Sequence, residues 1–310
     1  MVEATKIFTR AECVVCVLED VYTASQTIML SESKKKKIVE ETLGILHREL
    51  KEDQVPSSYI TGAHRILKKI SHQEDPFKEQ RRICNDAGIR VAEQVDQQLN
   101  AVKGRYERFR YLAKWAVAGN LIDIRTAGTS YELAGSDLQE RLVEASKEEL
   151  AVDELRRIYD VVTCSKRILY ILDNVGEIAL DRLFIRELRT YGLCVTVAAR
   201  GGPMTSDATV EDLSYVGLDK VSDKVIVTGA DTLGLIISEA SKEFLEEAMT
   251  ADVIIGKGQA NFYTLSTYRS RFSNTVISLF RTKCDCISSI FGKKGKIGIA
   301  TVIENSSRTT

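Results

Sequence analysis

The second part of the chain, from about residue 153 onward, alternates short apolar runs with longer segments of helical periodicity. The apolar runs have the length and composition of buried strands, and they are RILYIL, CVTVAA, KVIVTG, DVIIG and NTVISLF. Segments such as EIALDRLFIRELRTYG lie between most of them. Strands that alternate with helices indicate a parallel sheet with both faces covered. We therefore expect an α/β fold over residues 126–310, an α/β/α sandwich with a mostly parallel, Rossmann-like sheet.

The first part of the chain has a different pattern. Residues 11 to about 118 form one amphipathic segment after another, among them SKKKKIVEETLGILHREL and RYERFRYLAKWAVAG. No strand pattern interrupts them. The sequence predicts an all-helical N-terminal region, residues 1–125, next to the sandwich domain.

The composition argues against several kinds of partner. The formal net charge of -1 gives no electrostatic reason to expect nucleic acid or an acidic membrane surface. No apolar run reaches the roughly 20 residues of a membrane-spanning helix, and the N-terminus lacks the pattern of a signal peptide. We expect a cytoplasmic protein that binds neither nucleic acid nor membranes.

Polar residues follow each predicted strand. In parallel α/β sheets, ligands bind beyond the carboxyl ends of the strands, so these residues should meet at one edge of the sheet. The segments are residues 173–177, 200–207, 231–232, 257–261 and 281–283. Together they bring carboxylates, amides, glycines and lysines to that edge.

This mixture of residue types suits phosphate chemistry. Aspartate and asparagine oxygens bind hard divalent cations such as Mg²⁺ or Mn²⁺, whereas lysines and glycine-rich backbone bind phosphate oxygens. We interpret Asp173 and Asn174 as metal ligands delivered by a buried strand. Gly176 lets the chain turn closely around the site, and Glu177 begins a helix whose dipole favours an acid there. The edge therefore predicts phosphoryl transfer or phosphate ester hydrolysis.

Several motifs, in order from about residue 13 to 290, resemble one known family. They are ECVVCVLEDV, DPFKEQRRICNDAGIRVA, AVAGNLID, LDNVGE, RGGPMTSDAT, GKGQANF and TKC. The set resembles the metal-dependent damage-control phosphatases, long known only as a domain of unknown function, and in particular their C-x-x-C-containing subfamily. The resemblance implies a helical region packed on an α/β/α sandwich that hydrolyses a small phosphorylated metabolite, either a sugar phosphate or a phosphopantetheine-like compound.

The resemblance also implies roles for individual residues. A divalent cation (Mn²⁺, Co²⁺, Ni²⁺ or Mg²⁺) would be bound by Asp173, Asn174 and Asp207. Asp173 and Lys257 would be the catalytic residues, Lys257 by binding the phosphate. The predicted substrate and phosphate site comprises Asn120, Asp123, Glu177, Arg200, Gly258, Asn261 and Lys283.

The cysteines and histidines carry weaker signals. Cys13 and Cys16 form a C-x-x-C pair, and Cys284 and Cys286 form a C-x-C pair. Four thiolates could hold zinc, but we favour structural or idle thiols, with Cys84 as a further neighbour of the first pair. The three histidines lie on polar helical stretches, so we expect them on the surface.

Two other functions stay open. A nucleotide- or S-adenosylmethionine-binding transferase also uses acids at strand ends, but it would need a glycine-rich first loop, which LDNVGE supplies poorly. A non-catalytic metabolite-binding protein would keep the polar edge without turnover.

Overall fold

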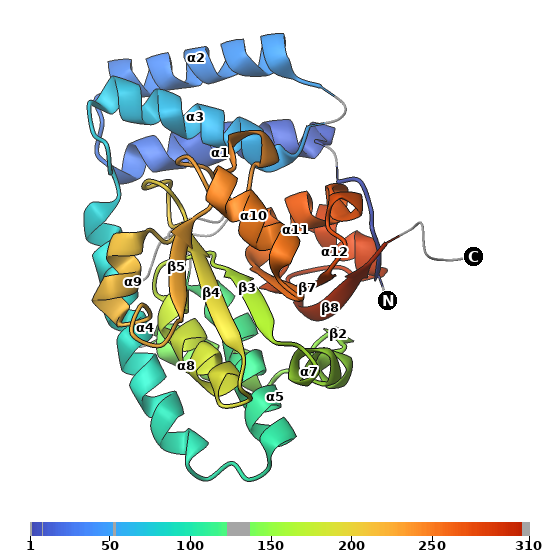
Figure 1. Ribbon diagram of the computed structural model, residues 1–310. Helices are drawn as coiled ribbons and strands as arrows, with labels where there is room; N and C mark the ends of the chain where they lie inside the picture. The colour runs from blue at the N-terminus through green and yellow to red at the C-terminus, as the bar shows by residue number, and fades with distance from the viewer. Residues whose placement is uncertain (1, 8, 52–53, 123–136, 306–310) are drawn as a thin grey trace.

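The computed structural model describes residues 2–7, 9–51, 54–122 and 137–305, and the statements below concern these residues (Figure 1). The N-terminal region forms the predicted succession of helices. They are α1 (Ala11–Thr27), α2 (Glu32–Glu49), α3 (Pro56–Ser71), α4 (Lys78–Leu99) and α5 (Arg105–Ala118), followed by the 3₁₀ turn η1 (Gly119–Leu121). Helices α1, α2 and α3 pack on one another and lie across one end of the sheet (Figure 1).

The sheet is mostly parallel, which confirms the predicted fold class. Its strands run in the order β1-β8-β7-β6-β3-β4-β5, and β2 also pairs with β8. Only the β7–β8 pair is antiparallel within the described chain. The strands are β1 (Val2–Glu3), β2 (Val152–Asp153), β3 (Arg167–Ile171), β4 (Cys194–Ala199), β5 (Lys224–Val227), β6 (Val253–Lys257), β7 (Thr275–Arg281) and β8 (Gly298–Glu304). The five predicted strands are present, whereas β1, β2 and β8 were not predicted.

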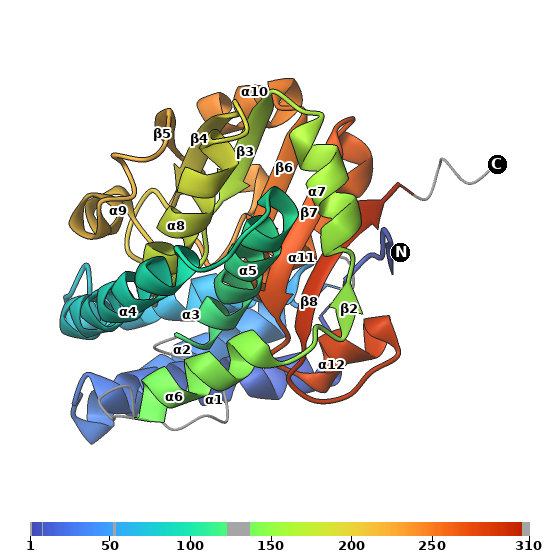
Figure 2. The ribbon, with the colours of Figure 1, turned by 90° about the horizontal axis from the view of Figure 1, so that it is seen from below.

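Helices cover both faces of the sheet (Figure 2). One face carries α4, α5, α7 (Leu155–Thr163) and α8 (Glu177–Arg189). The other carries α10 (Lys242–Thr250) and α11 (Gly258–Thr267), with the short α12 (Asp285–Ser288) nearby. The remaining helices are α6 (Asp137–Lys147), which packs on α5, and α9 (Val210–Val216), which packs on α4 and α8; short 3₁₀ turns lie at η2 (Ile237–Glu239), η3 (Arg269–Arg271) and η4 (Ser289–Phe291).

Alternate residues of each buried strand enter two apolar cores, because successive side chains of a strand point to opposite faces. Ile168 and Tyr170 of β3 pack with α4, α5 and α8, whereas Leu169 and Ile171 pack on the opposite side. The N-terminal helices thus share a core with the sheet. The predicted domain boundary between residues 125 and 126 lies outside the described residues. No described helix is long and apolar enough to cross a membrane.

Candidate active site

A cavity of about 220 Å³ lies between the N-terminal helices and the loops that follow β3, β4 and β7. We call it the rim cavity. The three predicted metal ligands, Asp173, Asn174 and Asp207, all line it, and so does Lys283. The structure therefore brings these four residues together as the sequence predicted. Asp20 and Ile60, from α1 and α3, form part of the facing wall.

Asp173 lies at the base of the rim cavity, and its side chain is held in place by amides. It is 3% exposed, and its Oδ2 accepts hydrogen bonds of 2.8 Å from Asn120 Nδ2 and from Asn174 Nδ2. Its carboxylate packs directly on Gly258, which has a φ of +77°; a Cβ there would lie 1.9 Å from Asp173 Oδ2. Gly258 is thus required by the position of Asp173.

The pKa of Asp173 reflects this crowded, buried position. Burial, first of all, and the negative charges of Glu177 and Asp207 together raise the pKa of Asp173 to about 8, against the opposing positive charges of Lys283 and Arg200. Glu177 has the buried Lys257 beside it, and Asp207 has the buried Arg200 beside it. Asp173 accepts hydrogen bonds from neutral amides instead, and a cation bound next to it would stabilise its ionised form.

Asp207 lies on the loop after β4, which pairs with the loop after β3. Val175 N–H donates to the carbonyl oxygen of Ser206 at 2.7 Å, and Ala208 N–H donates to that of Asp173 at 2.8 Å. Asp207 Oδ2 accepts from Arg200 Nε at 2.6 Å and from Gly234 N–H at 2.8 Å. Burial raises the pKa of Asp207, and the charge of Arg200 works against that rise.

The donor set fits a hard divalent cation. Asp207 Oδ1 is buried and has no hydrogen-bond partner among the described residues, so one lone pair of a carboxylate is left for another ligand. No group of three His, Cys, Asp or Glu side chains in the described chain could hold a metal ion. The amide oxygen of Asn174 would therefore be the third donor, and this Oδ1 accepts from Ser206 Oγ at 2.7 Å. Two carboxylates and an amide oxygen are ligands typical of Mg²⁺ or Mn²⁺.

Lys257 lies beneath the rim cavity, not in its wall. Its side chain is fully buried, and its ammonium contacts Glu177 and, at 2.8 Å, Asp181 Oδ1. Tyr170 O–H donates to the same Asp181 oxygen at 2.7 Å. Burial alone would lower the pKa of Lys257, but Asp181 and Glu177 outweigh it and raise the pKa above its ordinary value. The ammonium of Lys257 is already paired with the two carboxylates of Glu177 and Asp181. The predicted contact between Lys257 and phosphate stays a prediction.

Glu177 belongs to this buried cluster as well. One of its carboxylate oxygens contacts Lys257, and the other accepts from Asn120 Nδ2 at 2.8 Å. Asn120 lies in η1, and its Oδ1 accepts from Arg281 N–H at 3.1 Å. Asn120 therefore links Asp173 to Glu177 and to the end of β7. Asp123, which the resemblance also assigned to the pocket, lies outside the described residues.

Arg200 and Asn261 tie the ends of neighbouring strands together. Arg200 Nη2 donates to Asn261 Oδ1 at 2.9 Å and to the carbonyl oxygen of Leu172 at 3.1 Å. Asn261 Nδ2 donates to the carbonyl oxygens of Leu172 and Lys257. These two predicted substrate residues lie behind the cavity wall, and their contacts orient the loops that carry Asp173 and Asp207.

Four cysteines lie around the rim cavity, a grouping that the sequence did not predict. Cys13 and Cys16 of α1 face the same cavity as Cys284 and Cys286, and the Cys286 thiol donates to Glu12 Oε1 at 2.7 Å. Cys84 is buried in α4 and does not line this cavity. The two cysteine pairs that are distant in sequence are therefore neighbours in the fold.

The position of His64 shows that one prediction was wrong, because the sequence analysis placed all three histidines on the surface. His64 is 1% exposed, not on the surface, and its Nε2 lies 2.9 Å from Asp20 Oδ2. Burial, and to a lesser degree the charge of Lys68, lowers the pKa of His64 to about 3. A neutral imidazole thus supports Asp20, an acid in the wall of the rim cavity.

The fold and the rim cavity define a Rossmann-like α/β protein with an acid–amide site at the carboxyl edge of its sheet. The model of the damage-control phosphatase ARMT1-like domain matches residues 9–297. The chain belongs to this family.

Similar proteins agree with that assignment. A damage-control phosphatase of Pyrococcus horikoshii is 34% identical over 247 residues, covering 79% of this chain and 80% of the relative. An uncharacterized protein of Methanocaldococcus jannaschii is 31% identical over 292 residues, 94% of this chain and 93% of its own. The crystal structure of a DUF89 family protein from Pyrococcus horikoshii superimposes with a TM-score of 0.83 at 28% identity, covering 96% of this chain and all of that one.

Proposed function

We propose that the protein is a divalent-metal-dependent phosphatase that acts on a small phosphorylated metabolite in the cytoplasm. The observation that carries the proposal is the convergence of Asp173, Asn174 and Asp207 with Lys283 in one cavity, together with the unsatisfied Asp207 Oδ1. Two relatives bear the name damage-control phosphatase. All seven cysteines are free thiols, which fits a reducing compartment.

The residues that line the rim cavity and the buried residues next to it have different roles in ester hydrolysis. Asp173, Asn174 and Asp207 would hold the cation, which when bound polarises the phosphoryl group. Lys283 supplies the positive charge that this wall offers to phosphoryl oxygens, and its charge already acts on both aspartates. Asn120 keeps Asp173 in place through the 2.8 Å hydrogen bond. Lys257 neutralises Glu177 and Asp181 underneath, so the charged cluster can stay buried.

The size of the rim cavity favours a compact substrate. Its volume of about 220 Å³ is below the roughly 300–1,000 Å³ of pockets for drug-sized ligands. A sugar phosphate fits this space better than a long phosphopantetheine-like chain. Asp20 and Gln259, which also line the cavity, can hydrogen-bond to sugar hydroxyl groups.

Hydrolysis of p-nitrophenyl phosphate tests the proposal. We expect chelation to abolish turnover and addition of Mn²⁺, Co²⁺, Ni²⁺ or Mg²⁺ to restore it. Asp173→Ala should reduce metal-dependent turnover to background, whereas Asp160→Ala, which alters an exposed acid of α7, should not change it. Turnover that is unaffected by chelation, or full activity in Asp173→Ala, would show that the site is assigned wrongly. Phosphate binding without turnover would favour a non-catalytic metabolite-binding protein.

A further inference from the structure

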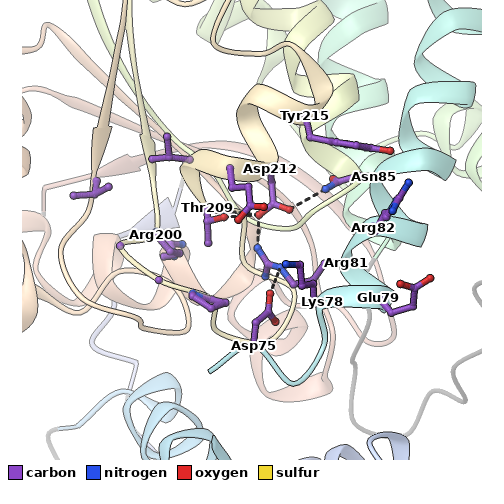
Figure 3. A pocket seen from close by; sticks show the side chains of 16 residues that line it. Asp75, Lys78, Glu79, Arg81, Arg82, Asn85, Arg200, Thr209, Asp212 and Tyr215 are labelled. Atoms are coloured by element: carbon purple, nitrogen blue, oxygen red, sulfur yellow. Dashed lines mark hydrogen bonds and ion pairs between the residues drawn. The ribbon is translucent and has the colours of Figure 1, made fainter. Parts of the chain in front are cut away.

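A second, larger cavity of about 740 Å³ lies beside α4, next to the loop that carries Asp207 (Figure 3). Equal numbers of acidic and basic side chains line it, so its charge selects no class of ligand. Several of these side chains instead bind one another and the neighbouring loops (Figure 3). The contacts of Arg81, Asn85 and Asp212 are therefore the informative feature of this region, and we call these three residues the α4 brace.

Arg81 holds the backbone of the loop after β4. It is 3% exposed, and its Nη1 donates to the carbonyl oxygens of Thr205 at 2.9 Å and Asp207 at 2.8 Å. Its Nη2 contacts Asp212 Oδ2. A planar guanidinium can make these contacts at once because its donors point in fixed, divergent directions, which an ammonium group cannot reproduce.

Asn85 lies one helical turn after Arg81 and contacts the other ligand-bearing loop. Its Oδ1 accepts from Gly176 N–H at 2.8 Å, within the segment that carries Asp173 and Asn174. Its Nδ2 donates to Asp212 Oδ1 at 2.9 Å. One amide side chain thus joins the loop after β3 to the residue that also binds Arg81.

Asp212 completes the brace at the start of α9. Its Oδ2 accepts from Thr209 N–H at 2.9 Å and from Thr209 Oγ1 at 2.7 Å, which caps the helix. The same carboxylate accepts from Arg81 and Asn85. The loop after β4 is therefore anchored to α4 at Thr205 and Asp207, and the helix that follows this loop is anchored to α4 at Asp212.

The backbones of α4 and the loop after β3 are in direct contact. A Cβ on Gly88 would lie 2.1 Å from the carbonyl oxygen of Gly176, and a Cβ on Gly176 would lie 2.5 Å from that of Cys84. Gly176 also has a φ of +75°, which favours glycine. The helix therefore fixes the position of the turn and leaves it no space to shift toward α4.

We propose that Arg81, Asn85 and Asp212 are positioning residues that hold the two ligand-bearing loops at a fixed separation and thereby preorganise the metal site. None of the three lines the rim cavity, so they act through the loops. The effect on catalysis rests on the proposed function. The effect on the loops does not, and it can be measured without metal or substrate.

Hydrogen exchange of the metal-free protein, followed by mass spectrometry, tests the structural part. Arg81→Lys should speed exchange in residues 204–209, and Asn85→Ala should speed it in residues 173–177, each about tenfold, because a buried hydrogen-bond partner is lost. Arg82→Lys, an exposed neighbour on the same helix, should leave both segments unchanged. Unchanged exchange in folded Arg81→Lys and Asn85→Ala would overturn the proposal, and the milder Arg81→Lys keeps it testable if Asn85→Ala does not fold.

Calorimetric titration of Mn²⁺ tests the consequence for the site. Groups that orient metal ligands typically contribute 10- to 100-fold to metal affinity or activity, so Arg81→Lys should weaken Mn²⁺ binding about tenfold. Its kcat for p-nitrophenyl phosphate should recover in part at saturating Mn²⁺, with little change in KM. A lower melting temperature with unchanged Mn²⁺ affinity would reduce Arg81 to a structural role and refute the proposal. A wild-type protein that binds no Mn²⁺ would instead refute the proposed function, while the exchange measurement still decides on the brace.

Discussion

Gly258→Ala should disable the site more severely than its small size suggests. The residue has a φ of +77°, and an added Cβ would lie 1.9, 2.0 and 2.4 Å from three atoms of the Asp173 carboxylate. Ordinary van der Waals contact begins near 3.4 Å, so the carboxylate would have to move about 1.5 Å, the difference between 3.4 and 1.9 Å. That shift would break its 2.8 Å hydrogen bonds to Asn120 and Asn174.

The expected loss of stability has two parts. A left-handed conformation costs a residue with a Cβ about 1–2 kcal/mol, and each lost hydrogen bond to a charged group costs about 1.5–3 kcal/mol. Gly258→Ala should therefore lower the free energy of unfolding by about 4 kcal/mol or more. Gly292→Ala is the matched control, because Gly292 has a φ of +66° and nothing within 4 Å of an added Cβ. It should lose only the conformational part, about 1–2 kcal/mol.

Urea unfolding measures both free energies, and calorimetric titration with Mn²⁺ measures the effect on the site. We expect Gly258→Ala to lose Mn²⁺ binding and Gly292→Ala to keep it. If Gly258→Ala unfolds at the same urea concentration as Gly292→Ala and binds Mn²⁺ like the wild type, the close approach of Asp173 to Gly258 is not what holds the site.

Three further perturbations address other parts of the molecule. Lys257→Met leaves Glu177 and Asp181 buried without their cation and should lower the free energy of unfolding in urea by about 3–5 kcal/mol. The control Lys224→Met, which removes an exposed ion pair, should lower it by no more than about 1 kcal/mol. Similar losses of stability in both variants would contradict the buried cluster. His64 has its pKa lowered to about 3 from about 6.5 in the unfolded chain, so the unfolded state binds more protons between these values and stability falls as the pH drops below about 6.5. The wild type should lose about 1.4 kcal/mol per pH unit there beyond the loss in His64→Gln; equal slopes would mean that Asp20 keeps the folded His64 protonated. The double variant Cys13→Ser with Cys16→Ser should retain hydrolysis and Mn²⁺ affinity under reducing conditions, since the predicted ligands are oxygen atoms, and a collapse of Mn²⁺ affinity in the folded variant would place the thiols in the site.

The convergence of the ligands could be predicted from the sequence because it follows from the sheet. Asp173 comes directly after the apolar run RILYIL, and Asp207 lies in the loop that follows the run CVTVAA. The carboxyl ends of neighbouring parallel strands meet at one edge of the sheet. β3 and β4 are indeed parallel neighbours. β8 was not predicted, although its sequence GIATVIE is an apolar, β-branched run of the kind that indicates a strand. Its antiparallel direction could not be predicted, because the path of the chain after β7 decides that direction and local periodicity does not encode the path.

The burial of Lys257 and His64 could not be predicted in the same way. Each depends on partners that are distant in sequence, Asp20 for His64 and the two acids of α8 for Lys257. One signal was available, because Glu177 and Asp181 are four residues apart and therefore share one face of a helix. Two acids on the face that covers a sheet indicate a buried cation nearby.

The outer edge of β8 has a consequence for the behaviour of the protein at high concentration. Unpaired backbone at a sheet edge can recruit another chain and start aggregation. Here β2 pairs with Ile299 and Ala300, and β1 pairs with Ile303 and Glu304. Between them, Glu154 Oε2 accepts from Val302 N–H at 2.8 Å. The short strands β2 and β1 and the carboxylate of Glu154 thus bind successive parts of the outer edge of β8. The long, β-branched β8 is therefore protected from edge-to-edge association with another chain, although it lies near the end of the sheet.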